Sequence, residues 1–215
     1  MRLIKLLFCV LPSAVLAQPL PMAKRPEYVG ISSERIERVR HVMKQDVESK
    51  RIPGGVLLIA RNGRIAMFDS FGYQDRKSSA AMKTDYIFRI ASMSKPITSV
   101  AAMILAEQGR LDIGAPVAQY LPEFKDVKVG IEKATPKRPM TVQDLLRHTS
   151  GLTYGIFGSS PVDELYKKNN FFLSKSLAEM VATVAKLPLA HQPGEIWEYS
   201  VSSDVLGRVV EVVIY

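Results

Sequence analysis

The stretch "RIASMSKPITSVAAMILAEQG", residues 89–109, decides how the chain is organised. Its long apolar run predicts a helix over residues 92–108. Pro96 is compatible with that helix, because the amides of the first turn have no partners within the helix. Ser92 and Lys95 then lie one turn apart on the same side of the helix start.

This serine and lysine have two interpretations. Ser92 could be a nucleophile activated by Lys95, which requires that the ordinary lysine pKa of about 10.4 be lowered by burial, a second cation or the positive end of a helix dipole. The helix start supplies the dipole, and it also lets the Ser92 amide face a developing oxyanion. Alternatively, Ser92 is an N-cap and Lys95 lies on a solvated face. The pair alone does not decide between the two.

A second segment, "PGEIWEYSVSSDVLGRVVE" at residues 193–211, adds an aromatic candidate. Tyr199 stands just before a helix expected to begin near Ser202, and a phenol in that place can act as a hydrogen-bonding acid or base. By itself, such a tyrosine is more often a buried aromatic.

Upstream, the pattern predicts a helix and a β-hairpin. Apolar residues recur at helical spacing from Ser33 to a turn at 53–55. Two apolar runs, 56–60 and 65–68, are joined by Asn62-Gly63, a pair suited to a tight hairpin turn. A helix followed by an antiparallel hairpin indicates the α+β class.

Downstream, three short helices are expected within 111–124, 140–152 and 176–188, and a fourth over 202–215. This part is helical and poor in strands. The last helix ends without a cap, a glycine or a polar tail, so we expect the sequence to be incomplete.

The first 17 residues have the pattern of a secretory signal peptide. Arg2 and Lys5 precede an apolar run that ends in small residues at Ala17, where cleavage is expected. The run is too short to remain as a stable membrane anchor. We therefore expect a signal peptide at residues 1–17 and a proline-rich extended leader at 18–32. A partial domain follows at 33–215. Its first part, 33–91, holds the helix and the hairpin, and its second part, 92–215, is mostly helical.

Composition excludes several other classes of protein. The formal charge is +8, of which Arg2 and Lys5 contribute two, leaving +6 on the mature chain. The basic residues are interspersed with acidic ones, which favours solvated faces over a nucleic-acid partner. Cys9, the sole cysteine, lies in the signal, so the mature protein has no disulfide, thiol nucleophile or cysteine metal site.

Three segments taken in order resemble the β-lactamase-related serine hydrolases, the group that contains class C β-lactamases, D-alanyl-D-alanine carboxypeptidases and esterases. They are "FRIASMSKPITSVAAMILAEQGRLDIGAPVAQYLPEF", "MTVQDLLRHTSGL" and the segment at 193–211. The resemblance runs from about residue 33 to the end. It implies an α+β serine β-lactamase/transpeptidase-like fold, in which helices flank an antiparallel sheet, with the C-terminal strands missing here.

The resemblance also implies the site. Ser92 is the nucleophile that forms an acyl-enzyme with an ester, amide or β-lactam carbonyl, without metal or cofactor. Lys95 is a base or the cation that stabilises a tyrosinate, and Tyr199 is a base and later an acid; which of the two takes the first proton stays open. In this family the histidine of "RHTSGL" is structural, so a nucleophile pair of Ser150 and His148 is rejected.

Two departures from the family pattern affect the expected activity. The peptidases and β-lactamases usually have Tyr-x-Asn, whereas Val201 stands here and offers no hydrogen bond to a substrate amide, which favours an esterase. No Lys-Thr-Gly-like or His-x-Gly-like motif follows Tyr199. Since the loss of one oxyanion donor costs roughly 10²- to 10³-fold in rate, we expect weak activity from these residues alone.

The sequence therefore favours an exported hydrolase, periplasmic or secreted, that acts on small esters, amides or β-lactams, with the peptidoglycan stem peptide as a further candidate substrate. A β-lactamase or D-Ala-D-Ala carboxypeptidase is the alternative enzyme. A non-catalytic fragment or peptidoglycan-binding remnant is the alternative outside catalysis, and a nucleic-acid binder is the remotest. The sequence predicts no oligomeric state.

Overall fold

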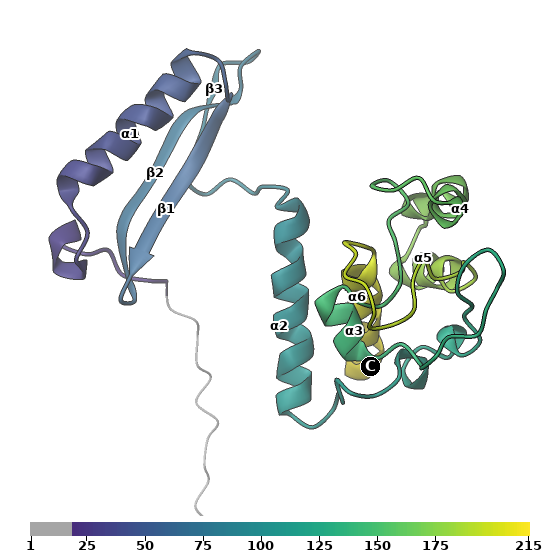
Figure 1. The fold of residues 1–215 in the computed structure, drawn as a ribbon. Coiled ribbons are helices and arrows are strands. Elements are labelled where there is room, and N and C mark those ends of the chain that lie inside the picture. The colour runs from purple at the N-terminus through teal and green to yellow at the C-terminus, as the bar shows by residue number, and fades with distance from the viewer. Residues whose placement is uncertain (1–18) are drawn as a thin grey trace, which may run out of the picture. The chain divides into compact units, whose positions relative to one another are not determined.

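The computed structural model describes residues 19–215, so the expected signal peptide and its cleavage site lie outside the described residues. The chain divides into two compact units, Met1–Phe88 and Arg89–Tyr215, which we describe separately (Figure 1). Within the described part of the chain, no helix is both long and apolar enough to cross a bilayer.

The first unit is a helix on a three-stranded sheet. Helix α1 (Ser33–Glu48) lies along the sheet, whose strands β1 (Gly54–Arg61), β2 (Arg64–Asp75) and β3 (Ala80–Ala81) pair antiparallel in the order β1-β2-β3 (Figure 1). The turn between β1 and β2 has positive φ angles at Asn62 (50°) and Gly63 (68°), as the Asn-Gly pair predicts. The predicted helix and hairpin are thus confirmed.

Alternation along the strands builds the small core of this unit. Leu57 and Ile59 of β1 and Met67 and Phe71 of β2 lie on one face of the sheet and pack in a cluster with Ile36 of α1. Each of these positions is apolar because the pleat turns it toward the helix.

The expected leader is not fully extended. The Ala23 amide donates a hydrogen bond to the Ile65 carbonyl, and the Ile65 amide donates one to the Pro21 carbonyl. A 3₁₀ helix, η1 (Pro26–Val29), follows. Val29 is buried in the core of the first unit. Ala23 and Ile31 pack against the same cluster, so this segment is part of the first unit. Its prolines led to the prediction of an extended leader.

The second unit is helical and poor in strands, as predicted. Helix α2 (Ser94–Glu107) packs against α6 (Ser202–Ile214), which also contacts α3 (Val142–Arg147) and α5 (Leu177–Val184) (Figure 1). The unit also contains the short 3₁₀ helices η3 (Val117–Gln119), η4 (Pro122–Phe124) and η5 (Phe171–Leu173). Buried valines and leucines of α6 form the centre of its core.

Three details of the second unit differ from the prediction. The segment 111–124, expected to form one short helix, contains only the 3₁₀ turns η3 and η4. The helix expected to begin at Ser92 begins at Ser94, and a separate 3₁₀ turn, η2 (Ala91–Met93), precedes it. Helix α4 (Pro161–Asn169) was not predicted, although Ser160 and Asp163 form a reciprocal capping box around a proline at its first turn. That Ser-Pro-x-Asp pattern is the signal that could have revealed α4.

Candidate active site

Ser92 lies in η2, directly before α2, and its side chain is exposed. Its neighbour Ala91 has φ of 46°, a left-handed conformation that costs a non-glycine residue roughly 1–2 kcal/mol. This local geometry, which no helical pattern predicts, directs the chain into α2 and leaves Ser92 at the surface of the second unit.

The three predicted site residues come together. The Tyr199 hydroxyl donates to Ser92 Oγ at 2.5 Å, and Lys95 Nζ donates to the same oxygen at 3.3 Å. Lys95 Nζ also lies 4.6 Å from the centroid of the Tyr199 ring. Ser92 Oγ therefore stands between a cation and a phenol, and the interpretation of Ser92 as a simple N-cap is wrong because no side-chain cap bond is formed at this helix start.

The proton affinities of this cluster point to different roles for Lys95 and Tyr199. Partial burial lowers the pKa of Lys95, but hydrogen bonding to Tyr199 and Tyr154 outweighs it, so the net shift is upward. Hydrogen bonding to Lys95, and secondly to Ser92, lowers the pKa of Tyr199 below 10.0. The lowered lysine pKa that a base would need is therefore not found, and the ammonium instead favours the tyrosinate.

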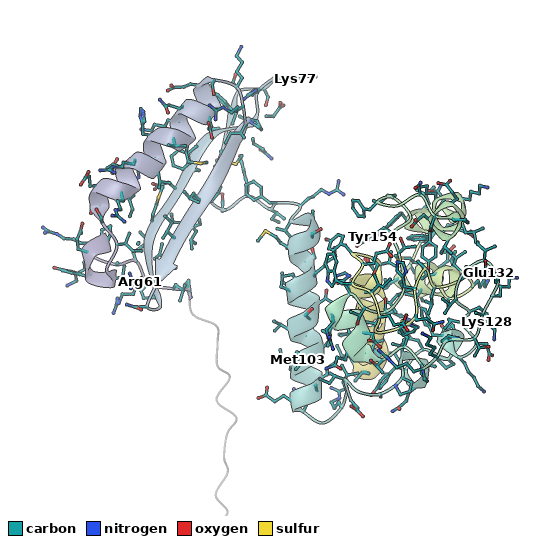
Figure 2. The ribbon with its side chains drawn as sticks, in the orientation of Figure 1. Arg61, Lys77, Met103, Lys128, Glu132 and Tyr154 are labelled. Atoms are coloured by element: carbon teal, nitrogen blue, oxygen red, sulfur yellow. The ribbon has the colours of Figure 1, made fainter. Side chains whose placement is uncertain are left out.

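Two residues near the cluster were missed by sequence reasoning. The Tyr154 hydroxyl faces Asp204 Oδ2 at 3.5 Å, and Lys95 Nζ lies 5.7 Å from the Tyr154 ring. Figure 2 shows Tyr154 beside the N-terminal end of α2. Burial raises the pKa of Asp204, while the charge of Lys95 opposes this shift. Tyr154 and Asp204 are far from Ser92 in the sequence, and no motif indicated that they would lie near it.

Ser150 and His148 do not form a nucleophile pair, as expected. Ser150 is fully buried and its hydroxyl shares a hydrogen bond with Ser202 Oγ at 2.7 Å. His148 Nδ1 accepts from the Ser200 amide at 3.3 Å, and the imidazole stacks on the Tyr199 ring with centroids 5.1 Å apart. Burial, and then the charge of Lys95, lowers the pKa of His148, so the ring is neutral and supports Tyr199 by packing.

A buried carboxylate holds the segment behind Tyr199. Asp144 accepts two hydrogen bonds from Arg138, at 2.6 and 2.8 Å, and others from Thr141 and Thr149. The carbonyl of Thr149 accepts from the Gly194 amide at 2.7 Å, which joins this network to the chain leading into Tyr199. Asp144 thereby fixes two segments that must keep their positions for Tyr199 to reach Ser92.

Val201, the residue that replaces the family asparagine, is fully buried at the start of α6. Its side chain packs in the core of the second unit. A buried apolar side chain offers no hydrogen bond to a ligand amide. Within residues 19–215, no cluster of three or more His, Cys, Asp or Glu side chains is arranged to hold a metal ion.

Comparison with known proteins relates this geometry to a family. The model of the beta-lactamase family matches residues 39–213. Esterase EstB of Burkholderia gladioli is 36% identical over 178 residues, which cover 81% of this chain and 44% of EstB. Protein Rv1367c of Mycobacterium tuberculosis is 36% identical over 166 residues, which cover 74% of this chain and 41% of the relative.

A solved structure gives the same result. EstCE1, described as a hydrolase with promiscuous acyltransferase activity, superposes with a TM-score of 0.75 at 35% identity, covering 83% of this chain and 47% of EstCE1. The chain thus spans less than half the length of these relatives.

Replacement of Asp144 by asparagine should destabilise the chain by about 2 kcal/mol at pH 7, measured by urea unfolding. Burial raises the pKa of Asp144, but its hydrogen bonds, first that to Arg138, lower it further, from 3.8 to about 2. A folded-state pKa below the unfolded one contributes stability above pH 4 that is lost as the pH falls through 2, so the difference between D144N and the parent should shrink over that range.

The matched control is Asp126→Asn, since Asp126 is exposed on the same unit. It should unfold within about 0.5 kcal/mol of the parent at every pH. A difference between D144N and the parent that stays constant from pH 6 to pH 2.5 would show that the charge of Asp144 does not hold these segments.

Proposed function

The chain belongs to the beta-lactamase family, and we propose that it is a serine hydrolase that cleaves esters through an acyl-enzyme on Ser92. The family and the α+β fold expected from the sequence are confirmed by the family match and by the likeness to EstCE1. The observation that carries the proposal is the pair of contacts on Ser92 Oγ, from Tyr199 at 2.5 Å and from Lys95 at 3.3 Å.

In the first step, Tyr199 acts as the base. Its lowered pKa and the adjacent Lys95 ammonium favour the tyrosinate, which takes the proton of the Ser92 hydroxyl as Oγ attacks the ester carbonyl carbon. The carbonyl π electrons move to oxygen and form a tetrahedral oxyanion. We assign the Ser92 amide as one donor to that oxyanion.

Collapse of the oxyanion breaks the bond between the carbonyl carbon and the alcohol oxygen. Tyr199 returns its proton to the departing alkoxide, which leaves as a neutral alcohol, and the acyl group stays on Ser92. A water molecule then gives a proton to Tyr199 while its oxygen attacks the acyl carbon. The proton passes back to Ser92 Oγ, and a carboxylic acid is released. Lys95 stays charged throughout, consistent with its raised pKa.

Esters are favoured over amides and β-lactams for two reasons. The buried Val201 offers no hydrogen bond to the amide side chain of a β-lactam or peptide substrate. The relatives EstB and EstCE1 are named as an esterase and a hydrolase. An ester also needs less help from the protein, because an alcohol leaves more readily than an amine.

A fluorophosphonate probe tests the nucleophile. We expect the intact mass of the folded chain to increase by one probe adduct, and Ser92→Ala to abolish it. Ser94→Ala is the matched control, because Ser94 is an exposed serine two residues away at the start of α2 and should keep the adduct. A folded, soluble chain that gains no adduct, or an adduct that persists in Ser92→Ala, refutes the proposal.

The pH dependence of labelling tests the role of Tyr199. Because Tyr199 must be ionised to accept the serine proton, the labelling rate should rise with pH and reach its half-maximum below pH 10. Tyr199→Phe should slow labelling at pH 8 by about 100-fold and remove the rise. Tyr28→Phe, an exposed tyrosine of the first unit, should change neither. An unaltered pH profile in Tyr199→Phe would assign the base elsewhere.

We also propose that the protein is exported, periplasmic or secreted, on the strength of residues 1–17 alone. Expression of the full sequence in a bacterial host should yield, outside the cytoplasm, a chain whose N-terminal residue is Gln18. Edman sequencing or intact mass of the exported material gives this directly. Recovery of a chain that still begins at Met1, in the cytoplasmic fraction alone, would remove the export proposal.

A further inference from the structure

An open pocket of about 610 Å³ lies beside Tyr199 within the second unit. Its size falls in the range of small-molecule sites, which run from about 300 to 1,000 Å³. Tyr199 lines this pocket and also contacts Ser92 Oγ, so a group bound here would lie next to an ester carbonyl placed at Ser92.

Aromatic side chains form much of the pocket wall. The ring centroids of Phe157 and Trp197 lie 6.0 and 6.5 Å from that of Tyr199, and Ile196 adds an aliphatic surface. Phe157 and Trp197 are 69% and 66% exposed, which is unusual for such large apolar side chains at one place. Exposed aromatic surface that lines a concavity is typical of a ligand site.

The polar groups of the pocket are already engaged. His191 Nε2 and Glu198 Oε2 lie 2.7 Å apart, within hydrogen-bond distance. The Asp163 carboxylate accepts from Thr153 Oγ1 at 2.7 Å and from Ser160 Oγ at 2.8 Å. Of the described residues that line the pocket, two are acidic and none is lysine or arginine. A carboxylate placed here would therefore find no lysine or arginine among the lining residues to replace its lost hydration.

We propose that this pocket binds an uncharged aromatic ring carried by the ester substrate. Such a ring stacks on Trp197 and Phe157 and needs no polar partner, whereas the negative charge of the lining repels an anionic group. The inference rests on the proposed function for its role in catalysis, since it names the group that lies next to the reacting carbonyl.

Binding can be measured without turnover, because Trp197 is the sole tryptophan and reports on the pocket by fluorescence. The full chain carrying Ser92→Ala is titrated with methyl phenylacetate and with phenylacetate, which share the ring and differ in charge. The ester should produce a saturable change in tryptophan emission, and phenylacetate should bind at least tenfold more weakly. Since this variant has no nucleophile, a failure of Ser92 to react with a fluorophosphonate leaves this result unaffected.

Two further variants in the Ser92→Ala background sharpen the test. Phe157→Ala should weaken methyl phenylacetate at least fivefold, and the matched Phe68→Ala, on a strand of the first unit, should not. Glu198→Gln should narrow the preference for the ester over phenylacetate, because it removes one negative charge from the lining. Equal binding of the two ligands, no saturable change, or an unaltered affinity in Phe157→Ala would each overturn the assignment.

Discussion

The contact between helices α2 and α6 is the constraint on which the site depends. Ser92 and Tyr199 are 107 positions apart, and they lie just before α2 and just before α6 respectively. Apolar residues of α6 bury themselves in the core of the second unit, and this packing sets the start of α2 beside the segment that precedes α6. A hydrogen bond of 2.5 Å tolerates little displacement, so the reactive geometry follows from hydrophobic packing several residues away.

The charge of Lys95 makes the two groups that contact Ser92, Lys95 and Tyr199, differ in how readily they lose a proton. When an ammonium and a phenol lie close together, the pKa of the ammonium rises and the pKa of the phenol falls, as they do for Lys95 and Tyr199. Asp204, a half-buried residue of α6 beside Tyr154, feels the charge of the same cation. Lys95 is thus a cationic centre whose charge favours the ionised forms of both Tyr199 and Asp204. In the proposed mechanism, it can assist proton transfer without releasing its own proton.

The sequence predicted the residues of the site better than their local structure. Ser92, Lys95 and Tyr199 were proposed together because three segments with distinctive flanks follow one another in order, and the structure places the three side chains in contact. The Asn62-Gly63 turn was predicted because its φ requirement is local. The 3₁₀ turn at Ser92 and the approach of Asp204 escaped notice, because they depend on how α2 meets α6. Periodicity reports which side of a helix is apolar, but it does not report which neighbour covers it.

The left-handed conformation of Ala91 has a consequence for how reactivity relates to folding. A non-glycine residue keeps such a conformation only while its surroundings impose it, so the turn should relax whenever α6 separates from α2. Ser92 would then lose its contacts with Tyr199 and Lys95 before the helices themselves unwind. If Ser92 reacts as proposed, its reactivity should report the first cooperative opening of the second unit. Conditions that loosen the core of this unit should then abolish the reaction while secondary structure persists.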